Sequence, residues 1–173
     1  EMDYRGYGLS EGSPSESGLY ADVSACLDWL AQMGLAGDRL VMYGFSMGSA
    51  PATELTANPA SLVPAWLCLE APFASAEVMG QSSTGLAIPG SFFTDLKIDN
   101  AEEIKEVEQP FFWIHGTADD FIDFESHGEV VWENYNGIRG VDVRVEGADH
   151  GDIPDVLGVE NYSAELLAFI TGQ

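Results

Sequence analysis

Basic side chains are scarce in this chain. Only six of its 173 residues are Lys or Arg, against 29 Asp and Glu, so the formal net charge at pH 7 is −23. A field of that sign repels the phosphates of nucleic acids and anionic membrane surfaces, which argues against both as partners. Repulsion among the acidic groups also costs stability at low salt and is screened at high salt. The composition therefore fits a halophilic or marine source as well as a generally acidic cytosolic protein.

Cysteine is nearly absent as well. Cys26 and Cys68 are the only two, and they form no Cys-x-x-Cys pattern. We expect two buried, reduced thiols in a cytoplasmic protein, with no disulfide and no metal site. Nor does any apolar run reach the roughly 18 residues that a membrane-spanning helix needs.

Stretches typical of strands alternate with stretches typical of helices. Strands are expected at 40–44, 62–69, 110–114 and 141–145, and helices at 19–33, after residue 48, at 124–135 and at 162–170. This alternation predicts an α/β fold, a three-layer α/β/α sandwich with a mostly parallel sheet. The length fits a single domain over residues 1–173.

The most specific motif lies at residues 40–48. An apolar, strand-like stretch runs into Gly-Phe-Ser-Met-Gly at 44–48, and small, helix-like residues follow. A serine on so tight a strand-to-helix turn is held in strained geometry with its hydroxyl above the sheet edge. We expect both glycines to be needed to avoid collisions. The backbone N–H of Met47 is placed to stabilise an oxyanion beside Ser46. The alternative is a plain glycine-rich turn.

A nucleophilic serine needs a base at neutral pH. Of the three histidines, His150 follows the strand-like stretch 141–145 and so lies at a strand's carboxyl end, where a parallel sheet collects its active site. His115 is more typical of a hydrogen-bonded residue at a strand end, and His127 of a surface or packing residue in a helix. His150 is therefore the predicted base.

The base in turn needs a carboxylate that fixes its tautomer and stabilises its protonated form. Asp119, Asp120 and Asp123 all lie in the loop after the 110–114 strand. We favour Asp119 because it is nearest to the strand's end. Asp120 is expected to be solvated, and Asp123 to be the N-cap of the next helix.

Four motifs in this order resemble the α/β-hydrolase superfamily, and within it the short-lid esterases and serine-aminopeptidase-like members. They are Asp-Tyr-Arg-Gly-Tyr-Gly-Leu-Ser at 3–10, Gly-x-Ser-x-Gly at 44–48, His-Gly-Thr-Ala-Asp at 115–119, and His150. The chain order of serine, acid and histidine is the one associated with that fold. The resemblance implies Ser46 as nucleophile, Asp119 as acid, His150 as base and Met47 as an oxyanion-hole donor.

The resemblance also implies elements that the chain lacks. In the family about three strands and a loop precede the 3–10 motif, and that loop supplies the second oxyanion donor. We therefore expect an N-terminally incomplete fold whose elbow strand has a bare edge, open to pairing with a partner. Three explanations are open: a C-terminal piece of a longer polypeptide, a natural minimal form, or a half completed by another chain. We favour the first.

Residues 71–109 form the one long stretch between core strands. In the family this insertion is a short lid over the active site. Its apolar residues, among them Phe92 and Phe93, are expected to line a substrate pocket. The sequence fits equally well a lid whose apolar residues pack on a core of its own and do not line the pocket.

The sequence thus predicts a serine hydrolase that cleaves carboxylic esters through Ser46, His150 and Asp119 and an acyl-enzyme intermediate. Its partner is a small-molecule ester, and no metal or organic cofactor is implied. Thioesterase and peptidase activities use the same machinery. The alternative outside catalysis is a binding or scaffold protein with a hydrolase-like fold.

The acidic composition predicts that salt stabilises the fold. Raising KCl from 0.1 to 1 M shortens the Debye length from about 10 to 3 Å, which weakens repulsion among the carboxylates. We expect a higher melting temperature, measured by circular dichroism at both concentrations. Chloride is preferred to sulfate because excluded salts strengthen apolar burial in any protein. A melting temperature that did not rise would contradict the halophilic interpretation.

Overall fold

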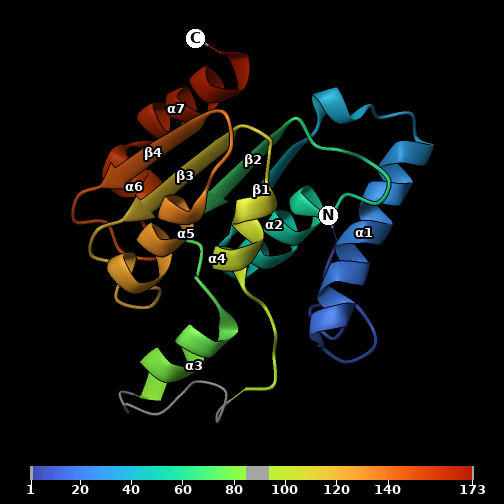
Figure 1. The fold of residues 1–173 in the computed structure, drawn as a ribbon, viewed down its shortest axis with the longest axis horizontal. Coiled ribbons are helices and arrows are strands. Elements are labelled where there is room, and N and C mark those ends of the chain that lie inside the picture. Colours follow the sequence, from blue (N-terminus) through green and yellow to red (C-terminus); the bar gives the residue numbers. More distant parts are fainter. Residues whose placement is uncertain (1, 85–93, 173) are drawn as a thin grey trace.

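The fold is built on one sheet of four parallel strands. The computed structural model describes residues 2–84 and 94–172. The strands are β1 (Val41–Phe45), β2 (Trp66–Glu70), β3 (Phe111–Gly116) and β4 (Gly140–Val145), in the order β1-β2-β3-β4. All three pairings are parallel, so the carboxyl ends of the strands meet at one edge (Figure 1). The sequence predicts all four strands, but the second, expected at 62–69, begins only at Trp66.

Helices and short helical turns connect the strands. The helices are α1 (Glu16–Gln32), α2 (Ser49–Ala57), α3 (Ala76–Thr84), α4 (Asn100–Glu103), α5 (Glu129–Asn134), α6 (Ile153–Leu157) and α7 (Val159–Thr171). The shorter turns are η1 (Gly37–Arg39), η2 (Ser46–Gly48), η4 (Ile104–Glu106) and the π-helical η5 (Phe124–Gly128). The expected helix at 124–135 is thus a π turn followed by α5.

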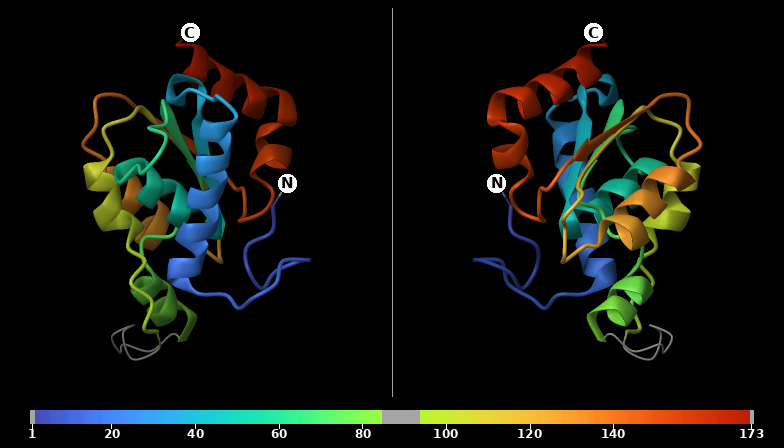
Figure 2. Two further views of the ribbon diagram at one scale, coloured as in Figure 1. Left: turned by 90° about the vertical axis from the view of Figure 1, so that its right-hand side faces the viewer. Right: turned by 90° about the vertical axis from the view of Figure 1, so that its left-hand side faces the viewer.

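The helices cover both faces of the sheet, which confirms the three-layer α/β/α sandwich (Figure 2). On one face α1, α2 and α5 pack on the strands through buried Leu27, Leu55 and Val131. On the other face α6 and α7 pack through Ile153 and Phe169.

The central strands are apolar on both sides because both sides are covered. Every residue of β3 is buried, and Phe111, Phe112 and Trp113 have no exposed surface. Burial of each such side chain stabilises the fold by roughly 1.5–3 kcal/mol. The sheet therefore forms a rigid platform, and the loops at its carboxyl edge are fixed by it.

One ionisable side chain and one thiol lie buried in the apolar core. Glu70, buried at the end of β2, accepts hydrogen bonds from the hydroxyls of Tyr43 in β1 and Tyr162 in α7, the latter at 2.6 Å. Of the two thiols, Cys68 is buried but Cys26 in α1 is partly exposed, so the expectation of two buried thiols is wrong for Cys26.

β1 is the edge strand beside the elbow, as expected. Within the described residues it pairs with β2 alone, and Tyr43 and Phe45 on it are more than 40% exposed. Pairing of this edge with a partner stays a prediction. None of the helices in the described part of the chain is long and apolar enough to cross a membrane.

The long insertion leaves the sheet after β2 and returns through α4. Its first described part carries α3, which stands clear of the sheet (Figure 1). A backbone bridge between Ser75 and Asp99 joins its two ends. The segment is therefore a closed excursion from the sheet. Phe92 and Phe93 lie outside the described residues.

Candidate active site

Ser46 lies at the turn between β1 and α2. The strand ends at Phe45, η2 follows, and α2 begins at Ser49. The φ angle of Ser46 is +51°, in the left-handed region that a residue with a Cβ rarely adopts. A residue held there costs roughly 1–3 kcal/mol, which the surrounding packing must offset. The strained strand-to-helix turn expected from the motif is therefore present.

The two glycines of the motif differ in their steric role. A Cβ on Gly44 would lie 2.5 Å from the carbonyl oxygen of Gly48, so only glycine fits where the turn folds back on the strand. A Cβ on Gly48 would meet no described atom within 4 Å, and its φ of −65° is helical. The expectation that both glycines are sterically required is wrong for Gly48. The close approach is made at one end of the turn only.

A buried polar chain supports the turn from below. The Ser49 hydroxyl donates to the Ser46 carbonyl oxygen at 2.6 Å, and the Asn100 amide donates to Ser49 Oγ at 3.0 Å. The same amide donates to the carbonyl of Phe73 at 2.8 Å. Asn100, the first residue of α4, thus ties the returning end of the insertion to the elbow. Sequence reasoning missed this residue, because an asparagine beside Asp99 at a helix start is typical of ordinary capping.

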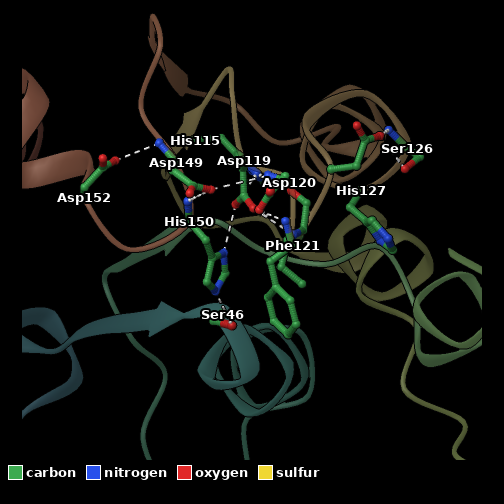
Figure 3. Close-up of polar contacts among 12 residues, drawn as sticks. Ser46, His115, Asp119, Asp120, Phe121, Ser126, His127, Asp149, His150 and Asp152 are labelled. Atoms are coloured by element: carbon green, nitrogen blue, oxygen red, sulfur yellow. Dashed lines mark hydrogen bonds and ion pairs between the residues drawn. The ribbon is translucent and has the colours of Figure 1, made fainter. Parts of the chain in front are cut away.

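Ser46, His150 and Asp119 form an unbroken hydrogen-bonded series (Figure 3). Ser46 Oγ lies 3.0 Å from His150 Nε2, and His150 Nδ1 lies 2.8 Å from Asp119 Oδ2. Asp119 follows β3, and His150 follows β4. The structure therefore brings together the three residues that the sequence selects, at distances suited to proton transfer from serine to imidazole.

Two aromatic rings contact the imidazole of His150. The centroids of Phe45 and Phe121 each lie 5.1 Å from the imidazole centroid. The backbone N–H of His150 donates to Asp149 Oδ1, and that of Asp149 donates to Asp152 Oδ1, both at 2.7 Å. These contacts fix the ring and its loop before any ligand arrives. The two carboxylates thus accept hydrogen bonds from the backbone. The described residues contain no group of three side chains suited to bind a metal ion.

The Asp119 side chain is fully buried. Burial alone would raise its pKa, but hydrogen bonds from His115, His150 and the Ile122 N–H lower the pKa below its usual value. Its Oδ1 accepts from the N–H groups of Phe121 at 3.0 Å and Ile122 at 2.7 Å. The carboxylate is therefore ionised at neutral pH and is held on both oxygens.

The remaining acidic candidates of this loop have the predicted roles. The Asp123 side chain accepts from the Ser126 N–H at 2.8 Å and caps η5, as the sequence predicts. Asp120 is exposed. Neither is bonded to the imidazole of His150.

The other two histidines are fully buried. His115 is hydrogen bonded through Nε2 to the Ile122 carbonyl at 2.8 Å, so the prediction of a hydrogen-bonded strand-end histidine is confirmed. Its Nε2 also lies 3.2 Å from Asp119 Oδ2, a contact that the sequence did not indicate. His127 accepts from the Ala74 N–H at 3.1 Å and is a packing residue, not a surface one.

An apolar hollow of about 530 Å³ opens beside Ser46. Met47, Phe73 and Phe121 border it, and α3 supplies further walls through Ala76 and Met79. It lies in the size range of small-molecule sites. The insertion therefore contributes to the surroundings of Ser46 through α3, whereas Phe92 and Phe93 are not among the described residues.

A second hollow, of about 260 Å³, adjoins the first. The two share Met47, Leu96 and Ile98 as walls, and the second is closed by Tyr4 and Leu19. Ser46 borders the first hollow but not the second. Two spaces thus meet next to the elbow and have Met47 as a common wall.

Comparison with known proteins agrees with the fold. A family model described as the alpha/beta hydrolase fold matches residues 2–87. The chain is 35% identical over 173 residues to alpha/beta hydrolase domain-containing protein 17B of Xenopus tropicalis, covering 98% of this chain and 54% of the relative. The human protein of that name is 36% identical over 155 residues, covering 87% and 49%. The chain spans about half the length of the curated relatives it matches.

Solved structures show the same fold at lower identity. An esterase of Pyrococcus furiosus superposes with a TM-score of 0.77 at 18% identity, over 98% of this chain and 67% of that one. The esterase RhEst1 of a Rhodococcus species gives a TM-score of 0.69 at 19% identity, over 98% and 78%.

The glycine asymmetry gives a matched pair of variants. Gly44→Ala forces the new methyl group against the Gly48 carbonyl, and we expect a loss of roughly 1–3 kcal/mol in the free energy of unfolding. Gly48→Ala has open space and a helical backbone, so we expect a change of less than about 0.5 kcal/mol. Urea unfolding measures both. Equal losses would contradict the one-sided close approach.

Proposed function

The chain belongs to the α/β-hydrolase superfamily, and we propose that it is a serine hydrolase that cleaves carboxylic esters. The observation that carries the proposal is the hydrogen-bonded series from Ser46 through His150 to buried Asp119, at the mouth of an apolar hollow. A binding protein would have no need of a strained serine hydrogen bonded to a histidine that is itself bonded to an ionised carboxylate.

The proposed reaction has two halves. Ser46 Oγ attacks the acyl carbonyl carbon while His150 Nε2 takes the hydroxyl proton, and Asp119 stabilises the resulting imidazolium. The Met47 N–H is the proposed donor to the oxyanion. Collapse of the tetrahedral intermediate breaks the bond to the alcohol, which receives the proton from His150. Water then attacks the acyl-enzyme with His150 again as base, releasing the acid and restoring Ser46.

The two hollows suggest where the halves of an ester bind. The larger one is bordered by Ser46 and is lined mainly by apolar side chains. We therefore place an apolar acyl group in it. The smaller one, which also has Met47 as a wall, is the proposed site of the leaving alcohol. Thioesters present the same acyl carbon and differ only in the leaving atom, so they belong to the same proposal.

Covalent labelling tests the nucleophile. A fluorophosphonate probe should modify the protein at Ser46, because the probe traps a serine activated by a neighbouring base. Ser46→Ala should abolish labelling, whereas Ser126→Ala, which removes an exposed hydroxyl bonded to Asp123, should not alter it. The modified residue is identified by peptide mass spectrometry. Absence of modification at Ser46 would overturn the catalytic proposal and leave a binding protein.

Acyl-chain length tests the larger hollow. Each buried methylene contributes about 0.8 kcal/mol, so kcat/KM for p-nitrophenyl esters should rise roughly fourfold per methylene from acetate until the hollow is filled. Met79→Ala removes part of the wall and should lower the hexanoate-to-acetate ratio. Leu9→Ala is the matched control, because Leu9 is 98% exposed and does not border the hollow. A ratio unchanged by Met79→Ala would refute the acyl assignment.

A further inference from the structure

His115 is a second histidine in contact with Asp119. Its Nε2 lies 2.8 Å from the Ile122 carbonyl oxygen and 3.2 Å from Asp119 Oδ2, and both side chains of this second pair are fully buried (Figure 3). Both atoms that face Nε2 are oxygens, so Nε2 must carry a proton. It donates this proton to both oxygens, of which the Ile122 carbonyl is the nearer. Asp119 Oδ2 therefore lies within hydrogen-bond distance of two imidazoles.

Ile122 closes this arrangement into a ring. Its N–H donates to Asp119 Oδ1 at 2.7 Å, while its carbonyl accepts from His115. His115 thus acts on Asp119 in two ways, directly at Oδ2 and through the Ile122 peptide at Oδ1. Rotation of the carboxylate away from His150 would break bonds at both oxygens.

The position of the His115 ring is set by its neighbours. Phe124 contacts it edge-on with centroids 5.7 Å apart, and the Trp113 centroid lies at 5.8 Å. A Cβ on Gly128 would lie 2.0 Å from Nδ1, so glycine is required at the end of η5. Nδ1 has no hydrogen-bond partner among the described residues. A buried polar atom left unpaired costs free energy, which the contacts made by Nε2 help to offset.

We infer that His115 is a positioning residue of the proposed hydrolase, which holds the Asp119 carboxylate in the orientation that His150 requires. The inference rests on the proposed function. It assigns η5 a part in the site as well, because this π turn supplies Gly128 and Phe124 to the imidazole of His115. Such turns often occur at functional sites.

A purely structural role for His115 makes a different prediction. If the imidazole served only to anchor the Ile122 carbonyl, its loss would weaken the fold but would leave the labelling rate of the folded protein unchanged. If it acts on Asp119, the effects of the two residues must be coupled. A double-mutant cycle separates these cases.

The cycle combines His115→Phe, which keeps a ring without a donor, with Asp119→Asn. The fluorophosphonate labelling rate of Ser46 should fall about 10- to 100-fold in His115→Phe, the size expected from a misplaced catalytic group. In the Asp119→Asn background the same substitution should change the rate less than about twofold. His115→Gln, which keeps an N–H of similar reach, should recover most of the wild-type rate.

Thr56→Ala is the control. Thr56 in α2 is also buried, and its hydroxyl donates to the Ala52 carbonyl of the same helix. It should change the labelling rate by the same factor in both backgrounds. Where His115→Phe does not fold, Gly128→Ala replaces it, because the added methyl group displaces a chemically intact imidazole and should slow labelling in the wild-type background only.

Urea unfolding of the same variants tests the contact between His115 and Asp119 without relying on any reaction at Ser46. Failure of the wild type to react at Ser46 would overturn the proposed function, yet His115 and Asp119 should still show non-additive losses of stability. Equal effects of His115→Phe in both backgrounds, in labelling and in unfolding, would overturn the positioning role.

Discussion

A buried negative charge is the constraint on which the candidate site depends. The Asp119 carboxylate has no exposed surface, and an ionised group in such a place is tolerated only when its oxygens are paired. Two backbone N–H groups and two imidazoles surround it. Each of these donors comes from a segment that the sheet fixes: the end of β3, the turn behind it, and the loop after β4. The carboxylate and its donors therefore require one another.

The three candidate residues could be selected from the sequence because of their positions along it. Ser46, Asp119 and His150 each follow an apolar stretch of strand character, and in a parallel sheet all such positions reach one edge. The alternation of elements likewise sufficed to predict the sheet and its two helical layers. Local patterns fix these features, because strand and helix periodicity and turn chemistry act over a few residues.

The supporting contacts could not be obtained in that way. Asn100 supports the elbow from a helix that lies 51 residues further along the chain, and nothing near it in sequence indicates the contact with Ser49. The His115 contact with Asp119 depends on how the turn after β3 folds back, and the space left by Gly128 depends on a π turn. These features follow from packing between segments. The one signal that sequence offered was the spacing of four between His115 and Asp119, which on a strand and loop has no fixed meaning.

The position of Ser46 early in the chain, directly after β1, has a consequence for how the protein is made. The hydrogen bond from Ser46 to His150 joins residues 104 positions apart, and the one from His150 to Asp119 joins residues 31 apart. Contacts between such distant residues form late, because a long loop must be closed before they are gained. The elbow emerges from the ribosome well before the base and the acid. A nascent or partly folded chain thus carries an ordinary serine hydroxyl, and the alignment with base and acid arises only when β4 docks on β3.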